Sequence, residues 1–157
     1  MDMKKLAGDK AATYVKDGMV VGLGTGSTAY HMVNAVGEMV KNGLKIQAIP
    51  TSKATEAQAR ELGIPLLTID ELDHVDLAID GVDEIDPQFN AIKGGGGALY
   101  REKVVASMAK EVIWIMDESK LVDKIGAFHL PVEIAQYGSK QARERMAGYG
   151  WNPVLRV

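Results

Sequence analysis

The stretch VVGLGTGST, residues 20–28, decides the fold of this 157-residue chain. The apolar run 19–23 is typical of a strand that is buried on both faces, and the glycines that follow turn the chain. A helix is expected from Ser27 or Thr28 to the stop signal Asn42-Gly43. The stretch therefore predicts one strand–turn–helix unit, in which a tight glycine turn leads into a helix N-terminus.

The same alternation continues on both sides of this unit. Further strands are expected at 45–49, 64–69, 75–79 and 112–116, and further helices at 3–15, 53–62 and 98–110. The acidic segment 80–87 is expected to be a loop. Strands that alternate with helices predict an α/β fold with an open, mostly parallel, Rossmann-like sheet and helices on both faces. The apolar positions expected to face the core are Leu6, Ala7, Tyr14 and Val15 in the first helix, and Met32, Val33, Val36, Met39 and Val40 in the second.

The regular alternation of strands and helices ends after residue 120. Beyond it, a short strand at 130–134 and a helix at 139–147 are expected. These elements predict an α/β domain at 1–128 and the beginning of a small α+β subdomain at 129–157.

Composition narrows the chemistry that the chain can perform. The apolar share of 46%, the charged share of 25% and the net charge of −3 are ordinary for a globular domain. Cysteine is absent, which excludes disulfides, thiolate metal sites and cysteine nucleophiles and favours a cytoplasmic location. Basic and acidic residues are interspersed and no apolar run approaches the roughly 20 residues of a membrane span, so neither a nucleic-acid nor a membrane partner is expected.

The loops that follow the strands are the expected binding sites, because ligands of open α/β sheets bind outside the carboxyl ends of the strands. In the first such loop, Thr25, Gly26, Ser27 and Thr28 precede a helix whose free amides and dipole favour an anion such as phosphate. The segment matches neither the dinucleotide fingerprint nor the P-loop. The alternative is a plain capped turn.

The second loop carries Asp80, Gly81, Val82 and Asp83 directly after a buried strand. Carboxylates there can bind sugar hydroxyls, hold a metal such as magnesium or act in acid–base chemistry. A solvated acidic turn is the alternative, because Asp and Gly are common turn residues.

The third loop is Lys93 followed by four glycines, of which Gly94, Gly95 and Gly96 come first. A glycine run makes sense where backbone amides approach a ligand, and Lys93 places a positive charge beside them. Glu102 lies near the start of the next helix, where it is either a candidate base or an ordinary partner of the helix dipole. Lys120, in the fourth loop, is a second candidate cation or a solvated lysine. The three histidines have no metal-ligand spacing.

These motifs, taken in series, resemble ribose-5-phosphate isomerase type A. The matching segments are GTGST at 24–28, DGVDE at 80–84, KGGG at 93–96 and REK at 101–103. The resemblance implies an aldose–ketose isomerase that interconverts ribose 5-phosphate and ribulose 5-phosphate through a cis-enediolate, without metal or organic cofactor. It also implies a homodimer or homotetramer.

By the same resemblance, Glu102 is the proton acceptor, and the substrate-binding stretches fall on residues 25–28, 80–83, 93–96 and Lys120. Lys93 is expected to stabilise the developing oxyanion. Asp80 and Asp83 are expected to hold hydroxyls and assist ring opening. The distal phosphate is assigned to Ser27 and Thr28 with Lys4 or Lys120, a choice that stays open.

Two other functions on the same fold remain as alternatives: a non-catalytic sugar-phosphate sensor, and a CoA transferase-like protein with Glu102 as nucleophile. Family members continue for several dozen residues beyond the position that matches Val157, so we expect most of the small subdomain to lie outside this chain.

Overall fold

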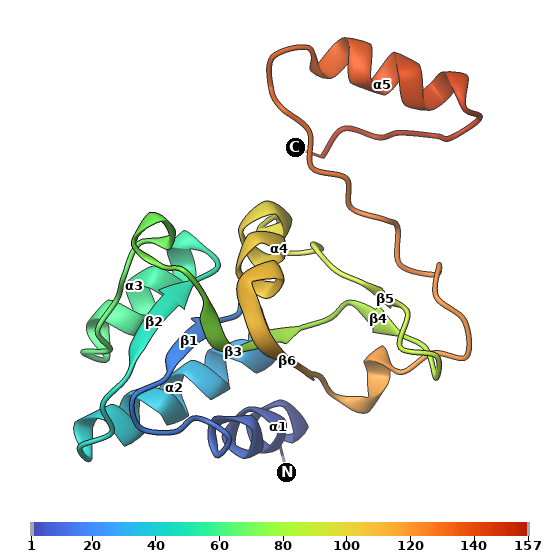
Figure 1. The fold of residues 1–157 in the computed structure, drawn as a ribbon. Coiled ribbons are helices and arrows are strands. Elements are labelled where there is room, and N and C mark those ends of the chain that lie inside the picture. Colours follow the sequence, from blue (N-terminus) through green and yellow to red (C-terminus); the bar gives the residue numbers. More distant parts are fainter. Residues whose placement is uncertain (1, 157) are drawn as a thin grey trace.

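A four-stranded parallel sheet forms the centre of the computed structural model, which describes residues 2–156 (Figure 1). Its strands lie in the order β2, β1, β3, β6, with bounds Gln47–Pro50, Val20–Leu23, Val75–Gly81 and Ala109–Ile115. All three strand pairs are parallel, so the four carboxyl ends meet at one edge. The predicted α/β class with a mostly parallel sheet is confirmed.

Helices cover both faces of this sheet. On one face, α1 (Met3–Ala12), α2 (Ser27–Lys41) and α3 (Lys53–Glu61) pack with alternate side chains of β1 and β3, among them Val21 and Ile79. On the other face, α4 (Leu99–Met108) contributes Val105 to a second cluster with Ile49 and Ala78. Strand alternation therefore divides the core into two layers.

The centre of α2 lies in the core as expected, whereas the prediction for α1 was partly wrong. Met32, Val33 and Val36 are fully buried. In α1, which ends at Ala12 rather than at residue 15, Leu6 and Tyr14 are half exposed. The buried residues of α1 are instead Gly8, Ala11 and Ala12, because the helix crosses close to the backbone of α2.

The strand expected at 64–69 does not form. Leu66 makes only an isolated bridge to Ala48, and Ile69–Glu71 is a 3-10 helix (η1) capped by Thr68. Pro65 has no N–H to donate to a longer ladder, which explains the failure.

The segment at 80–87, expected to be a loop, contains the end of β3 and the short strand β4 (Glu84–Ile85). β4 pairs antiparallel with β5 (Ala91–Ile92) to form a hairpin beside the main sheet.

The chain beyond the 3-10 helix η2 (Glu118–Lys120) is largely irregular until α5 (Ser139–Gly148), which stands apart from the sheet (Figure 1). The expected strand at 130–134 is absent, since Leu130 and Val132 are exposed and pair with no strand. Hydrogen bonds tie this segment to the α/β body at both of its ends. Near its start, Val122 N donates to Ile85 O, and Gly126 N and Phe128 N donate to Glu84. Further along, Tyr100 N donates to Glu133 Oε2, and Arg156 Nη1 donates to Gly95 O.

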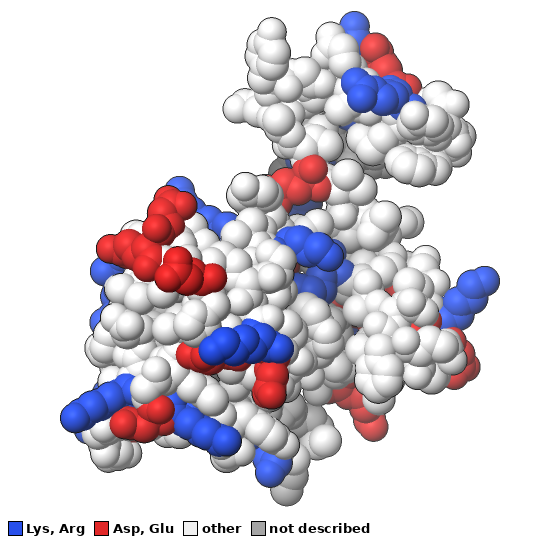
Figure 2. Space-filling model, in the orientation of Figure 1, with Lys and Arg blue, Asp and Glu red and all other residues white. Residues whose placement is uncertain are grey.

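Positive and negative side chains alternate over the face drawn in Figure 2, which shows no continuous basic stripe. Within residues 2–156, no helix has the length and apolar character needed to cross a bilayer.

We expect Gly8→Ala to lower the free energy of unfolding by about 1–3 kcal/mol, as overpacking does. A Cβ on Gly8 would lie 2.7 Å from the backbone nitrogen of Met32, and neither helix can give way locally. Gly148→Ala, where a Cβ would meet no atom within 4 Å, is the matched control. Urea unfolding of both variants measures the difference, and equal stability would contradict the close crossing of α1 and α2.

Candidate functional site

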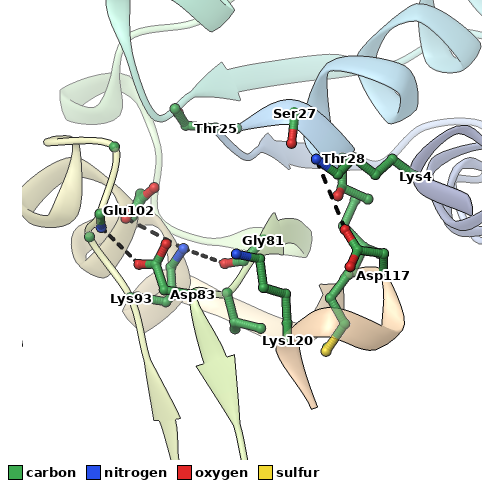
Figure 3. Close-up of a pocket in the computed structure, with 17 residues that line it drawn as sticks. Lys4, Thr25, Ser27, Thr28, Gly81, Asp83, Lys93, Glu102, Asp117 and Lys120 are labelled. Atoms are coloured by element: carbon green, nitrogen blue, oxygen red, sulfur yellow. Dashed lines mark hydrogen bonds and ion pairs between the residues drawn. The ribbon is translucent and has the colours of Figure 1, made fainter. Parts of the chain in front are cut away.

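A pocket lies at the carboxyl edge of the sheet, where the loops after β1, β3 and β6 meet the glycine run (Figure 3). Its lining residues are Lys4, Thr25, Gly26, Ser27, Thr28, Gly81, Val82, Asp83, Lys93, Gly94, Gly95, Gly96, Glu102, Ile115, Met116, Asp117 and Lys120. All the predicted site residues except Asp80 therefore line one pocket. Figure 3 shows Glu102, Lys93 and Asp83 gathered at one end, and Ser27, Thr28, Lys4 and Asp117 at the other.

Hydrogen bonds from two threonines that follow β2 hold the loop between β1 and α2 in place. Thr25 Oγ1 lies 2.7 Å from Thr51 Oγ1, which in turn donates to Leu23 O at 3.0 Å. Thr55 Oγ1 donates to Gly24 O at 3.0 Å. These hydrogen bonds were not predicted from the sequence. The sequence contains little to indicate this role. Thr51 and Thr55 only follow the neighbouring strand β2, whose carboxyl end lies at the same edge of the sheet.

The end of this loop exposes a helix N-terminus to the pocket. Gly26 is the N-cap of α2, with a φ of 114° that disfavours any side chain, and no side chain within residues 2–156 caps the helix. The first amides of α2 and the Ser27 hydroxyl are thus available to an anion. Lys4 lies nearby, 4.0 Å from Asp117 Oδ2.

Asp80 is buried beneath the pocket wall. Its Oδ1 accepts hydrogen bonds from Thr25 N at 2.9 Å and Gly81 N at 2.7 Å, and its Oδ2 lies 3.2 Å from Lys93 Nζ. A Cβ on Gly24 would lie 2.4 Å from Asp80 Oδ1, so the glycine is required for this approach. Asp80 therefore contacts protein groups on both of its oxygens, and the structure does not bring it to the pocket surface.

Lys93 is the centre of a buried charge cluster. Its Nζ donates to Gly81 O at 2.5 Å, pairs with Asp80, and lies 3.4 Å from Glu102 Oε2. It also lies 5.2 Å from the centre of the Trp114 ring, a cation–π contact that sequence analysis missed. The ammonium group is thus held by three oxygens and an aromatic face.

Glu102 is 4% exposed, and its Oε2 has no hydrogen-bond partner among the described residues. Burial raises the pKa of this carboxyl, the negative charge of Asp80 raises it further, and Lys93 opposes the shift. A carboxylate that is aimed at a pocket, lacks a hydrogen bond and has a raised pKa is suited to accept a proton.

The glycine run closes the same end of the pocket. Gly95 N donates to Asp83 Oδ2 at 2.8 Å, which orients the Asp83 carboxylate, and Gly97 N donates to Gly94 O. Gly96 lines the pocket near Thr25, and its N–H makes no hydrogen bond to any described residue. Residues 2–156 contain no group of three or more His, Cys, Asp or Glu side chains arranged to hold a metal ion.

Two comparisons with known proteins, one with family models and one with curated sequences, point to the same family. The family model "Ribose 5-phosphate isomerase A (phosphoriboisomerase A)" matches residues 47–157. Ribose-5-phosphate isomerase A of Streptococcus gordonii is 58% identical over 156 residues, which cover 99% of this chain and 69% of that protein.

Solved structures agree with this result. Ribose 5 phosphate isomerase A from Neisseria gonorrhoeae superposes with a TM-score of 0.92 at 36% identity, covering 99% of this chain and 69% of that one. A D-ribose-5-phosphate isomerase in complex with phospho-erythronic acid gives 0.89 at 38% identity, covering 95% of this chain and 66% of that one. The chain spans about two thirds of the length of these relatives, none of which is a sensor or a CoA transferase.

We expect the Glu102 carboxyl to titrate above about 4.3, the ordinary value of a glutamate. Carbon-13 NMR of the side-chain carboxyl carbons, with Glu102→Gln identifying the signal, measures its pKa directly. Lys93→Met should raise this pKa further, because it removes the charge that opposes the shift, whereas Asp80→Asn should lower it. A pKa that moves in the opposite direction in either variant would contradict the charge cluster.

Glu102→Gln should raise the melting temperature between pH 7 and 8. A carboxyl whose pKa is higher in the folded than in the unfolded state costs stability above its folded pKa, and costs nothing below its unfolded pKa. The gain should therefore disappear as the pH falls toward 4. Calorimetry across this range measures the gain, and a variant that is less stable than the unchanged chain at pH 8 would refute the assignment.

Proposed function

The chain belongs to the ribose 5-phosphate isomerase A family, and we propose that Glu102 moves the proton by which it interconverts ribose 5-phosphate and ribulose 5-phosphate. The single observation that carries this proposal concerns Glu102 Oε2. This buried carboxylate oxygen has no hydrogen-bond partner in the described part of the chain and lies 3.4 Å from the Lys93 ammonium group in the pocket.

In the proposed reaction, Glu102 Oε2 takes the proton from C2 of the open-chain aldose. The electron pair of the C2–H bond forms a C1–C2 double bond, and the carbonyl oxygen on C1 becomes the oxyanion of a cis-enediolate. Glu102 then returns its proton to C1, while the oxygen on C1 gains a proton and the hydroxyl on C2 loses one to become the ketone. No proton is gained or lost overall.

Lys93 supplies the charge that makes this step feasible. Glu102 is ionised before the transfer and neutral after it, so one of the two carboxylates beside the Lys93 ammonium loses its charge as the oxyanion forms. Asp80 keeps the ammonium in place throughout. A positive charge that is already positioned in a buried site stabilises the oxyanion without reorganisation.

The remaining groups hold the substrate between the two ends of the pocket. The amides that begin α2, the Ser27 and Thr28 hydroxyls, Lys4 and Lys120 form the proposed phosphate end. Asp83, whose Oδ2 is oriented by Gly95 N, is proposed to bind sugar hydroxyls and assist ring opening. Binding energy from the distal phosphate then positions C1 and C2 beside Glu102.

The finer points of assembly and location are also proposals. A homodimer or homotetramer is supported by exposed large apolar side chains such as Leu130, Tyr149 and Trp151. A cytoplasmic location is supported by a sequence without cysteine.

Incubation with ribose 5-phosphate, followed by detection of the ketose, tests the proposed function. We expect Glu102→Gln to lower kcat by at least about 100-fold, because the general base is lost. Binding of phospho-erythronic acid, measured by calorimetry, should remain within about threefold. Glu111→Gln, an exposed glutamate of β6, is the matched control and should keep normal turnover. Near-normal turnover in Glu102→Gln would refute the role of this residue.

A further inference from the structure

Gly95 is in close contact with side chains from two other segments. Its N–H is bound by Asp83, and a Cβ added to it would lie 2.6 Å from Asp83 Oδ1 and 2.7 Å from Phe128 Cζ. The tip of the Phe128 ring and the Asp83 carboxylate therefore both occupy the space that a side chain at residue 95 would need, and both pack against the glycine backbone. Phe128 does not line the pocket, so it acts as a support behind the pocket wall.

Phe128 is held in turn by Glu84, the residue next to Asp83. Glu84 Oε1 accepts a hydrogen bond from Phe128 N at 2.7 Å, and Glu84 Oε2 accepts one from Gly126 N at 2.7 Å. Glu84 is 6% exposed although it forms no ion pair with any described residue. Both of its oxygens are used to bind one loop that is more than 40 residues distant in sequence.

We propose that Glu84 is a positioning residue, which acts through Phe128 to fix the backbone of Gly95 and Gly96 in the pocket. Asp83 then restrains the glycine run directly, by its hydrogen bond to Gly95 N, and Glu84 restrains it indirectly, through the Phe128 ring. This inference rests on the proposed function, because the fixed amides would face the reacting end of the sugar phosphate.

The energetic argument is one of preorganisation. A run of four glycines has the largest conformational freedom of any backbone, so its amides bind a ligand well only if other groups restrict them. The free N–H of Gly96 has no partner among the described residues, and its direction depends on how Gly95 is held. A displacement of about 1 Å in such a group can cost about 100-fold in rate.

Glu84→Gln tests the first link. The amide NH2 that replaces one carboxylate oxygen would face a backbone N–H, so one of the two bonds to residues 126–128 is lost. Phe128→Leu tests the second link and leaves Glu84 unchanged. Asp86→Asn is the control, because it perturbs the far end of the same hairpin while keeping the oxygen that accepts from Gln88 N and Asn90 N.

Nitrogen-15 NMR of the full chain provides a readout that needs no turnover. We expect Glu84→Gln and Phe128→Leu to shift the amide signals of Gly95 and Gly96, and Asp86→Asn to leave them in place. In the ketose assay, the first two variants should lower kcat about tenfold or more, with a smaller change in KM, since the phosphate end is untouched.

The outcomes separate the two proposals. If the unchanged chain gives no ketose, the proposed function fails, while the glycine signals still decide the role of Glu84. If either folded variant leaves the Gly95 and Gly96 signals in place, the positioning role is overturned. If Glu84→Gln does not fold, Phe128→Leu decides by the same signals. If Asp86→Asn shifts the Gly95 and Gly96 signals and lowers kcat as much as Glu84→Gln does, Glu84 only stabilises the hairpin. That outcome also overturns the proposal.

Discussion

The buried ion cluster of Lys93 with Asp80 and Glu102 is the constraint on which the site depends. Two neighbouring buried carboxyl groups repel each other when both are ionised, and a cation between them offsets this repulsion. Lys93 Nζ lies 3.2 Å from Asp80 Oδ2 and 3.4 Å from Glu102 Oε2. The cluster needs contributions from β3, from the segment after β5 and from α4, so it forms only when the sheet, the hairpin and the helix have assembled. Chemistry and tertiary structure are therefore coupled through one ammonium group.

The parts of the fold that follow from periodicity were predictable, and the parts that follow from long-range pairing were not. The apolar runs before Gly24 and Asp80 identified two parallel strands, and parallel strands place their following loops at one edge. The same reasoning predicted a strand at 64–69, where Pro65 prevents a ladder, and missed the β4–β5 hairpin, whose strands have two residues each. Such short strands leave no periodic signal.

The site was predicted by residue type and only in part by role. Thr25 and Asp83 line the pocket as the sequence suggested, whereas Asp80 was expected at the surface of the pocket and lies beneath it. The reason is geometric. The sequence pattern of a polar residue at the end of a strand does not show whether its side chain contacts a ligand or backbone amides. Only the close approach of Gly24, and the amides of Thr25 and Gly81, assign Asp80 to the interior.

The two aspartates of β3 show how position on one strand sets opposite electrostatics. At the amino end, Asp76 accepts from Lys110 Nζ and Val20 N, and these contacts lower its pKa to about 2. At the carboxyl end, burial raises the pKa of Asp80. By linkage, Asp76 contributes stability above its unfolded pKa and loses that contribution as the pH falls toward 2, whereas Asp80 and Glu102 destabilise the fold when ionised. The amino end of the sheet thus stabilises the fold at neutral pH, while the carboxyl end carries an electrostatic cost that a reactive carboxylate requires.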